Sequence, residues 1–213
     1  MRKRLTTLFI VALVVAGSID AQVPERVQLP DPQRTGGMPL MEALDKRQSM
    51  RSFSQQELSK QLLSNILWAA YGINREDGRR TAPSARNYQP FDIYLIMADG
   101  WYMYEPGENA LHKLGNDDLR EDAGTQDYVA TAPLNLIFVS DYDRLPGSDD
   151  SGKYITSSTD VGFISQNVYL YCASEGLATV VRGLVDRDLL KEVLRLRPSQ
   201  HVVLGQSVGF PGN

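Results

Sequence analysis

The chain has 213 residues, of which 42% are hydrophobic and 23% charged, and a formal net charge of -4 at pH 7. That length supports one domain with a good core, and an acidic chain without a concentrated basic stripe argues against a nucleic-acid partner. The one cysteine, Cys172, excludes an intrachain disulfide and is interpreted as a small buried hydrophobe. Neither His112 nor His201 has a Cys, His or acidic neighbour at ligand spacing, so no metal site is predicted.

The N-terminus has the pattern of a signal peptide. Arg2, Lys3 and Arg4 precede an apolar run over residues 8–16, and Ala21 is followed by polar sequence. We therefore expect residues 1–21 to be removed near Ala21, which leaves an exported, periplasmic chain of net charge -6 with no membrane span. A retained amphipathic anchor is the alternative. No cysteine follows the apolar run, so lipid attachment is not expected.

The mature chain begins with a polar, proline-containing arm over residues 22–37, expected to pack loosely or to wrap a neighbour. A short helix is predicted over residues 40–47. A stronger apolar stripe begins after Ser59, a good N-cap, and ends at Gly72. The polar segment 73–88 is predicted to be a loop, where functional side chains tend to lie.

A β-rich middle follows the loop. Residues 91–97 and 101–104 are predicted to form a hairpin around Asp99-Gly100, and residues 134–139 another buried strand. A short polar helix is predicted over residues 117–122. The polar connection 141–158 is predicted to be a modest lid or rim.

The last third alternates helices and strands. A helix is predicted over residues 160–175 and should end at Gly176. It is apolar on several sides, which either burial within one subunit or a place in a dimer core would explain. A strand at 177–181, a helix at 186–196 and a strand at 202–208 complete the chain. This order predicts one three-layer α+β domain over residues 38–213, built around a central sheet.

The segment Arg47-Gln48-Ser49-Met50-Arg51 has the composition of a phosphate clamp. In an extended backbone, residues two apart share a side, so Arg47, Ser49 and Arg51 can present two guanidinium groups and a hydroxyl together. Arginine is suited to phosphate because its planar, permanently charged group donates bidentate hydrogen bonds. Cations at a solvated helix end are the alternative explanation.

Together these segments resemble the FMN-dependent nitroreductases over nearly the whole mature chain. The matching motifs, in order, are Arg47-Gln48-Ser49-Met50-Arg51-Ser52-Phe53, the helix 58–72, Pro83-Ser84-Ala85-Arg86-Asn87-Tyr88-Gln89-Pro90, the helix containing Ser165-Gln166-Asn167, the segment from Gly176 to Gly183, and Val208-Gly209-Phe210-Pro211. Each motif alone is unspecific, but their order and spacing make the match specific. The chain is most similar to a short exported branch that resembles the azoline (SagB-type) oxidases of peptide maturation.

The resemblance implies an α+β, three-layer fold with a central mixed, mainly antiparallel sheet flanked by helices. It also implies that Arg47, Gln48, Ser49 and Arg51 bind the FMN phosphate end. By the same resemblance, Pro83, Ser84, Ala85 and Asn87 hold the flavin from a second side, and Val181, Arg182 and Gly183 lie at its reactive edge, where a backbone N–H can donate to N5. Turn chemistry at 83–87 and a strand-end kink at Gly183 are the alternatives.

The implied activity is that of an FMN oxidoreductase, which transfers electrons or hydride through flavin N5 to or from a small nitro, quinone or azoline-type molecule. A homodimer that shares the cofactor site is implied as well. The electron donor is unknown, because NAD(P)H is expected inside the cell. The alternatives are an exported flavin-binding or partner-docking module without fast turnover, and a cofactor-free binding protein.

One departure from the family concerns a cation near the C-terminus that reaches the phosphate in many members. No cation follows Arg197 in this chain. Arg86 and Arg182 are candidates to replace it, and weaker FMN binding is the alternative.

Overall fold

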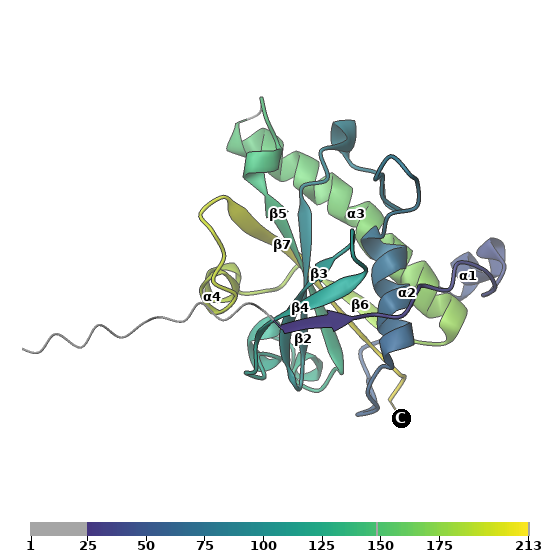
Figure 1. Ribbon diagram of the computed structural model, residues 1–213. Coiled ribbons are helices and arrows are strands. Elements are labelled where there is room, and N and C mark those ends of the chain that lie inside the picture. Colours follow the sequence, from purple (N-terminus) through teal and green to yellow (C-terminus); the bar gives the residue numbers. More distant parts are fainter. Residues whose placement is uncertain (1–24, 148, 213) are drawn as a thin grey trace, which may run out of the picture.

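The computed structural model describes residues 25–147 and 149–212, and Figure 1 shows their arrangement. The signal peptide expected at 1–21 and the first residues of the arm, 22–24, lie outside the described residues.

The described strands form one sheet in the order β1-β4-β3-β2-β5-β7-β6, and each neighbouring pair is antiparallel. The strands are β1 (Glu25–Gln28), β2 (Phe91–Met97), β3 (Gly100–Glu105), β4 (Ala110–Gly115), β5 (Leu134–Asp141), β6 (Ala178–Arg182) and β7 (Gln200–Gly209). Strands β2 and β5 lie in the centre and are buried on both faces, which agrees with their nearly continuous apolar sequences. Strand β6 lies at one end of the sheet, so among the described strands only β7 pairs with it.

Helices cover both faces of the sheet. They are α1 (Leu40–Lys46), α2 (Lys60–Tyr71), α3 (Asp150–Glu175) and α4 (Arg187–Val193), with 3-10 turns at Ala85–Asn87, Glu121–Ala123, Asp127–Val129 and Tyr142–Arg144. Helices α2 and α3 pack side by side on one face and α4 lies against the other, as Figure 1 shows. The α+β class and the three layers predicted from the sequence are therefore confirmed.

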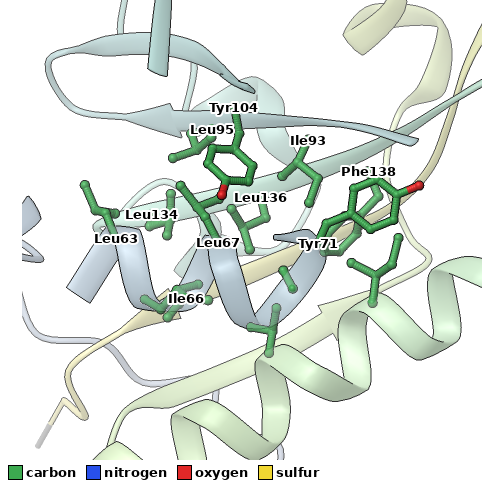
Figure 2. Close-up of a cluster of buried hydrophobic side chains, with 14 of the residues drawn as sticks. Leu63, Ile66, Leu67, Tyr71, Ile93, Leu95, Tyr104, Leu134, Leu136 and Phe138 are labelled. Atoms are coloured by element: carbon green, nitrogen blue, oxygen red, sulfur yellow. The ribbon is translucent and has the colours of Figure 1, made fainter. Parts of the chain in front are cut away.

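Alternate residues of the central strands supply two hydrophobic cores. On one face, Ile93 and Leu95 of β2 pack with Ile66 and Leu67 of α2, a region drawn in Figure 2. On the other face, Ile96 contributes to a second cluster together with residues of α4. A sheet covered on both sides in this way is a rigid support for segments at its edge.

The boundaries of α2 and of the first hairpin agree with the predictions. Ser59 is the N-cap of α2 and its hydroxyl accepts a hydrogen bond from the Leu62 N–H at 3.2 Å, while Gly72 is the C-cap. The predicted hairpin is present, with Met97 of β2 opposite Gly100 of β3.

The N-terminal arm is more ordered than expected. Its described part begins with β1, which pairs with β4, a strand that the sequence analysis did not assign. Farther along the arm, Leu29 is buried and the Gln33 N–H donates to the Asn65 side chain at 2.9 Å. The expectation of a loosely packed arm is therefore wrong for these residues, because this segment extends the chain's own sheet.

Helix α3 begins at Asp150 and not at residue 160 as predicted, so the expectation of a polar lid over residues 141–158 is wrong from Asp150 onward. Asp149 caps the helix by accepting a hydrogen bond from the Gly152 N–H at 2.7 Å. The first ten residues are polar and rich in Ser and Thr, which hides their helical periodicity. Two other helices are shorter than expected: 117–122 contributes only to a 3-10 turn, and α4 ends at Val193.

Candidate functional site

The segment 47–51 lies along the outer edge of β6. Arg47 is the C-cap of α1, and the chain continues so that the Met50 N–H donates to the Thr179 carbonyl of β6 at 3.0 Å. The segment thus follows the edge strand of the sheet. This arrangement fixes its backbone on the rigid part of the fold and leaves Ser49 and Arg51 exposed.

Tyr169 of α3 joins this segment to β6. Its hydroxyl lies 2.7 Å from the Ser49 hydroxyl and accepts a hydrogen bond from the Val181 N–H at 2.9 Å. Its ring lies under Arg47, with the guanidinium carbon 5.3 Å from the ring centroid. Sequence reasoning missed Tyr169, because a tyrosine within an apolar helical stripe gives no signal of such a role.

The positive charges of the clamp are not neutralised by protein groups. Within residues 25–147 and 149–212, neither Arg47 nor Arg51 forms an ion pair, and Arg51 makes no hydrogen bond to another residue. Gln48 is exposed between them and adds no charge. The segment thus carries two uncompensated guanidinium groups with the Ser49 hydroxyl between them in the sequence, and the chemistry of these donors fits the phosphate of FMN.

The second predicted segment, 83–87, is anchored to α3 at Asp160. The buried carboxylate accepts a hydrogen bond from the Ala85 N–H at 3.1 Å, and burial raises the pKa of Asp160. Pro83 and Ala85 are exposed, while the Ser84 hydroxyl accepts a hydrogen bond from the Gln89 N–H at 3.0 Å. Exposed side chains on an anchored loop are available to a ligand.

The backbone of this loop is strained. Arg86, Asn87 and Gln89 have φ values of 50°, 60° and 49°, in the left-handed region that residues with a side chain seldom adopt. The Asn87 side chain accepts a hydrogen bond from the Gln89 amide at 3.0 Å, which holds the turn. Such strain is often found at ligand-binding loops in proteins, and the binding role of this loop stays a prediction.

One chain does not bring the two segments together. Asp160 and Tyr169 are nine residues apart on α3, which corresponds to about 14 Å along the helix axis. At about 100° per residue they also project from opposite flanks of the helix. In agreement, Asn167, beside Asp160 on the helical wheel, donates to the Ala69 carbonyl of α2, whereas Tyr169 contacts β6. Helix α3 therefore separates the loop from the clamp.

Arg182 points away from the clamp, into the protein. Only 3% of the residue is exposed, and its guanidinium donates to the Ala123 carbonyl at 2.7 Å and to the Asn135 side chain at 3.2 Å. No carboxylate of the described residues pairs with it, and burial lowers its pKa to about 10, so it is charged at neutral pH. Arg182 is thus not the surface cation that replaces the family's C-terminal one.

The backbone beside Arg182 remains accessible. Val181 already donates its N–H to Tyr169, so that group is occupied. Alternate residues of a strand direct their backbone groups to the same edge, and Gly183 is the next in that series. Gly183 is exposed, and its N–H is the candidate in this stretch for an external acceptor.

One cavity lies beside the 47–51 segment and another lies away from all predicted site residues. One of about 390 Å³ opens beside the clamp, and Arg47, Gln48 and Tyr169 contribute to its wall. Another of about 500 Å³ lies between β1 and the start of α2 and contains none of the predicted site residues. The described residues include no cluster of His, Cys, Asp and Glu that could hold a metal ion, and no helix among them is long and apolar enough to cross a membrane.

Comparison with known proteins identifies the family. The model of the nitroreductase family matches residues 44–210, which is most of the chain and includes both predicted segments. The chain belongs to the nitroreductase family. A candidate nitroreductase of Methanocaldococcus jannaschii is 32% identical over 80% of this chain and 90% of its own length. The 4-nitrobenzoate reductase of Pseudomonas putida is 26% identical over 77% of this chain and 82% of its own.

A solved nitroreductase-like structure agrees with this assignment. The crystal structure of a candidate nitroreductase from Ralstonia eutropha superposes with a TM-score of 0.84 at 40% identity, covering 88% of this chain and 90% of that one. As a nitroreductase-family protein with these relatives, the chain is an oxidoreductase.

Proposed function

We propose that this chain is an FMN-dependent oxidoreductase whose clamp, Arg47, Ser49 and Arg51, binds the FMN phosphate. The observation that carries the proposal is that Arg47 and Arg51 lack ion-pair partners among the described residues and flank the exposed Ser49 on a segment held at the rigid edge of the sheet. Family membership adds independent support.

In this proposal the protein's own groups bind and orient the cofactor. Arg47 and Arg51 supply charge and bidentate donors to the phosphate, and the Gly183 N–H supplies a donor at the end of β6. The 83–87 loop supplies polar side chains and a fixed backbone. Bound FMN supplies two-electron transfer between a donor and an acceptor.

A flavin titration of the chain beginning at Gln22 tests the proposal. We expect saturable binding, followed by FMN fluorescence, and at least a tenfold weaker affinity in Arg51→Ala, because a charge-assisted phosphate contact is lost. Arg26→Ala is the matched control, since Arg26 is an exposed arginine of β1 at the opposite end of the sheet. An absence of binding, or equal binding by Arg51→Ala, would refute the phosphate clamp.

We also propose a homodimer that completes the cofactor site. Within one chain, α3 separates the clamp from the 83–87 loop, so a second copy is the simplest source of the missing half. Large apolar side chains on the outer surfaces of α1 and α3 support this: 75% of Met41, 62% of Ile155 and 45% of Phe163 are exposed. A second copy of this chain would cover them.

Light scattering on the purified protein tests the dimer. Phe163→Glu places a charge on the proposed interface, and we expect it to give a monomer that binds FMN poorly. Leu189→Glu is the control, because Leu189 is an exposed apolar residue of α4, on the other face of the sheet. A parent protein that is a monomer in solution and still shows saturable FMN binding would contradict the shared site.

Substrate and location complete the proposal. The name of the P. putida relative indicates nitroaromatic acids as the first acceptors to test. Export is proposed from the basic and apolar N-terminus, and mass spectrometry of the secreted chain should find Gln22 at its start. Because nicotinamide cofactors are expected inside the cell, reduced quinones and artificial donors should be compared with NADPH. Bound flavin that no donor reduces would favour a flavin-binding module instead of an enzyme.

A further inference from the structure

We infer that the Tyr169 hydroxyl sets the direction of the Ser49 hydrogen bond, so that Ser49 donates its proton outward to the phosphate of the bound flavin. Tyr169 is thus a positioning residue, which acts on the cofactor through Ser49. This inference rests on the proposed function, because it assigns a mechanism to the same phosphate clamp.

The Tyr169 hydroxyl has a single proton for its two hydrogen bonds. A phenol carries one proton and a peptide N–H can only donate, so Tyr169 is the acceptor from Val181 at 2.9 Å. The Tyr169 proton then needs an acceptor of its own. Among the described residues, the Ser49 oxygen at 2.7 Å is the one other group within hydrogen-bond reach of this buried hydroxyl. Burial makes an unused phenol proton costly, so Tyr169 donates to Ser49.

That direction determines what Ser49 can do. Because its oxygen already accepts from Tyr169, its own proton is free, and it makes no other hydrogen bond within the described part of the chain. Ser49 is exposed, so this proton can reach a ligand. Bonds arranged head to tail from the Val181 N–H through both hydroxyls polarise one another and strengthen the last donor.

The chemistry favours an anionic acceptor at this point. Arg47 is held over the Tyr169 ring, with its guanidinium carbon 5.3 Å from the centroid, and has no carboxylate partner among the described residues. One side chain therefore positions a cation with its ring and a hydroxyl donor with its oxygen. Phosphate oxygens accept from both kinds of donor.

The test compares FMN with riboflavin, which has the same ring system without the phosphate. Tyr169→Phe removes the hydroxyl and keeps the ring under Arg47. We expect the Kd for FMN to rise about fivefold, the effect of one net hydrogen bond, and the Kd for riboflavin to change less than twofold. Tyr171→Phe is the matched control on the same helix, and we expect it to leave both Kd values unchanged.

A second variant keeps the inference testable if Tyr169→Phe folds poorly. Ser49→Ala alters an exposed residue and should show the same selective loss for FMN, and adding Tyr169→Phe should cost little more. Equal weakening of FMN and riboflavin, or unchanged FMN binding, would overturn the inference and remove Ser49 from the clamp. FMN binding by the two arginines would still stand if Arg51→Ala weakens it. A parent protein that binds neither flavin would overturn the proposed function itself.

Discussion

The buried Arg182 allows a quantitative test through its neighbour Gly124. A β-carbon at position 124 would lie 2.0 Å from Arg182 Nη1, although the backbone there is extended, with φ 172°, and accepts any residue without strain. Gly124→Ala must therefore displace the guanidinium. The displaced group would lose its 2.7 Å hydrogen bond to the Ala123 carbonyl inside the protein, where water cannot replace it.

A charged hydrogen bond of this kind contributes about 2 kcal/mol, so we expect Gly124→Ala to lower the free energy of unfolding by about that amount. For a domain of this size the melting temperature should fall by about 4–8 °C. In an Arg182→Met background the obstructing charge is gone. The same glycine substitution should then cost less than about 0.5 kcal/mol, which gives a coupling energy of about 1.5 kcal/mol.

Urea unfolding of the parent, Gly124→Ala, Arg182→Met and the double variant measures this coupling energy. Gly183→Ala is the control, because apart from its chain neighbours its β-carbon would meet only Leu204 Cδ2, at an ordinary contact distance of 3.9 Å. An equal cost of Gly124→Ala in both backgrounds, or an equal cost of Gly183→Ala, would refute the assigned position of the guanidinium.

Two further predictions concern the helix layer. Burial raises the pKa of Asp160, so this residue adds stability below the pKa that it has in the unfolded chain, and that stability is lost as the pH rises through its folded pKa. Asp160→Asn keeps an oxygen acceptor for the Ala85 N–H and removes the charge. In urea unfolding at pH 7 this variant should be more stable than the parent, and the difference in stability should shrink in acid. A difference that grows in acid would contradict the reasoning. Ile66→Ala empties a fully buried position of the core drawn in Figure 2 and should cost about 3 kcal/mol in the same assay, whereas Leu184→Ala, at a residue 67% exposed, should change stability by less than about 0.5 kcal/mol.

Local signals were enough to predict much of the fold. Ser59 and Gly72 mark the ends of α2 because capping depends on neighbouring residues, and Asp99-Gly100 marks the first hairpin for the same reason. Strand β1 was missed because Glu25–Gln28 is short and polar. Its pairing with β4 joins residues more than eighty positions apart, which no local pattern reveals.

In the candidate site too, local sequence signals predicted some features, and features that depend on distant contacts were missed. The residue types and spacing of Arg47, Ser49 and Arg51 predict a phosphate clamp, and the structure places this segment on a fixed edge of the sheet. The position of Arg182 could not be predicted, because a cation in a strand is assumed to face solvent, and here it lies against Ala123 and Asn135 instead. Tyr169 was missed because its role depends on contacts between three separate segments.

The two ends of the sheet resist aggregation in different ways. Strand β1 is only four residues long and carries charged side chains, including Arg26, which pairs with Glu108. The outer edge of β6 is closed instead by Met50 and Tyr169, which use the Thr179 carbonyl and the Val181 N–H. A substitution that detaches the 47–51 segment would therefore expose the edge of β6, which could then pair with strands of other chains. Such a substitution would damage the candidate cofactor site and lower the solubility of the protein at the same time.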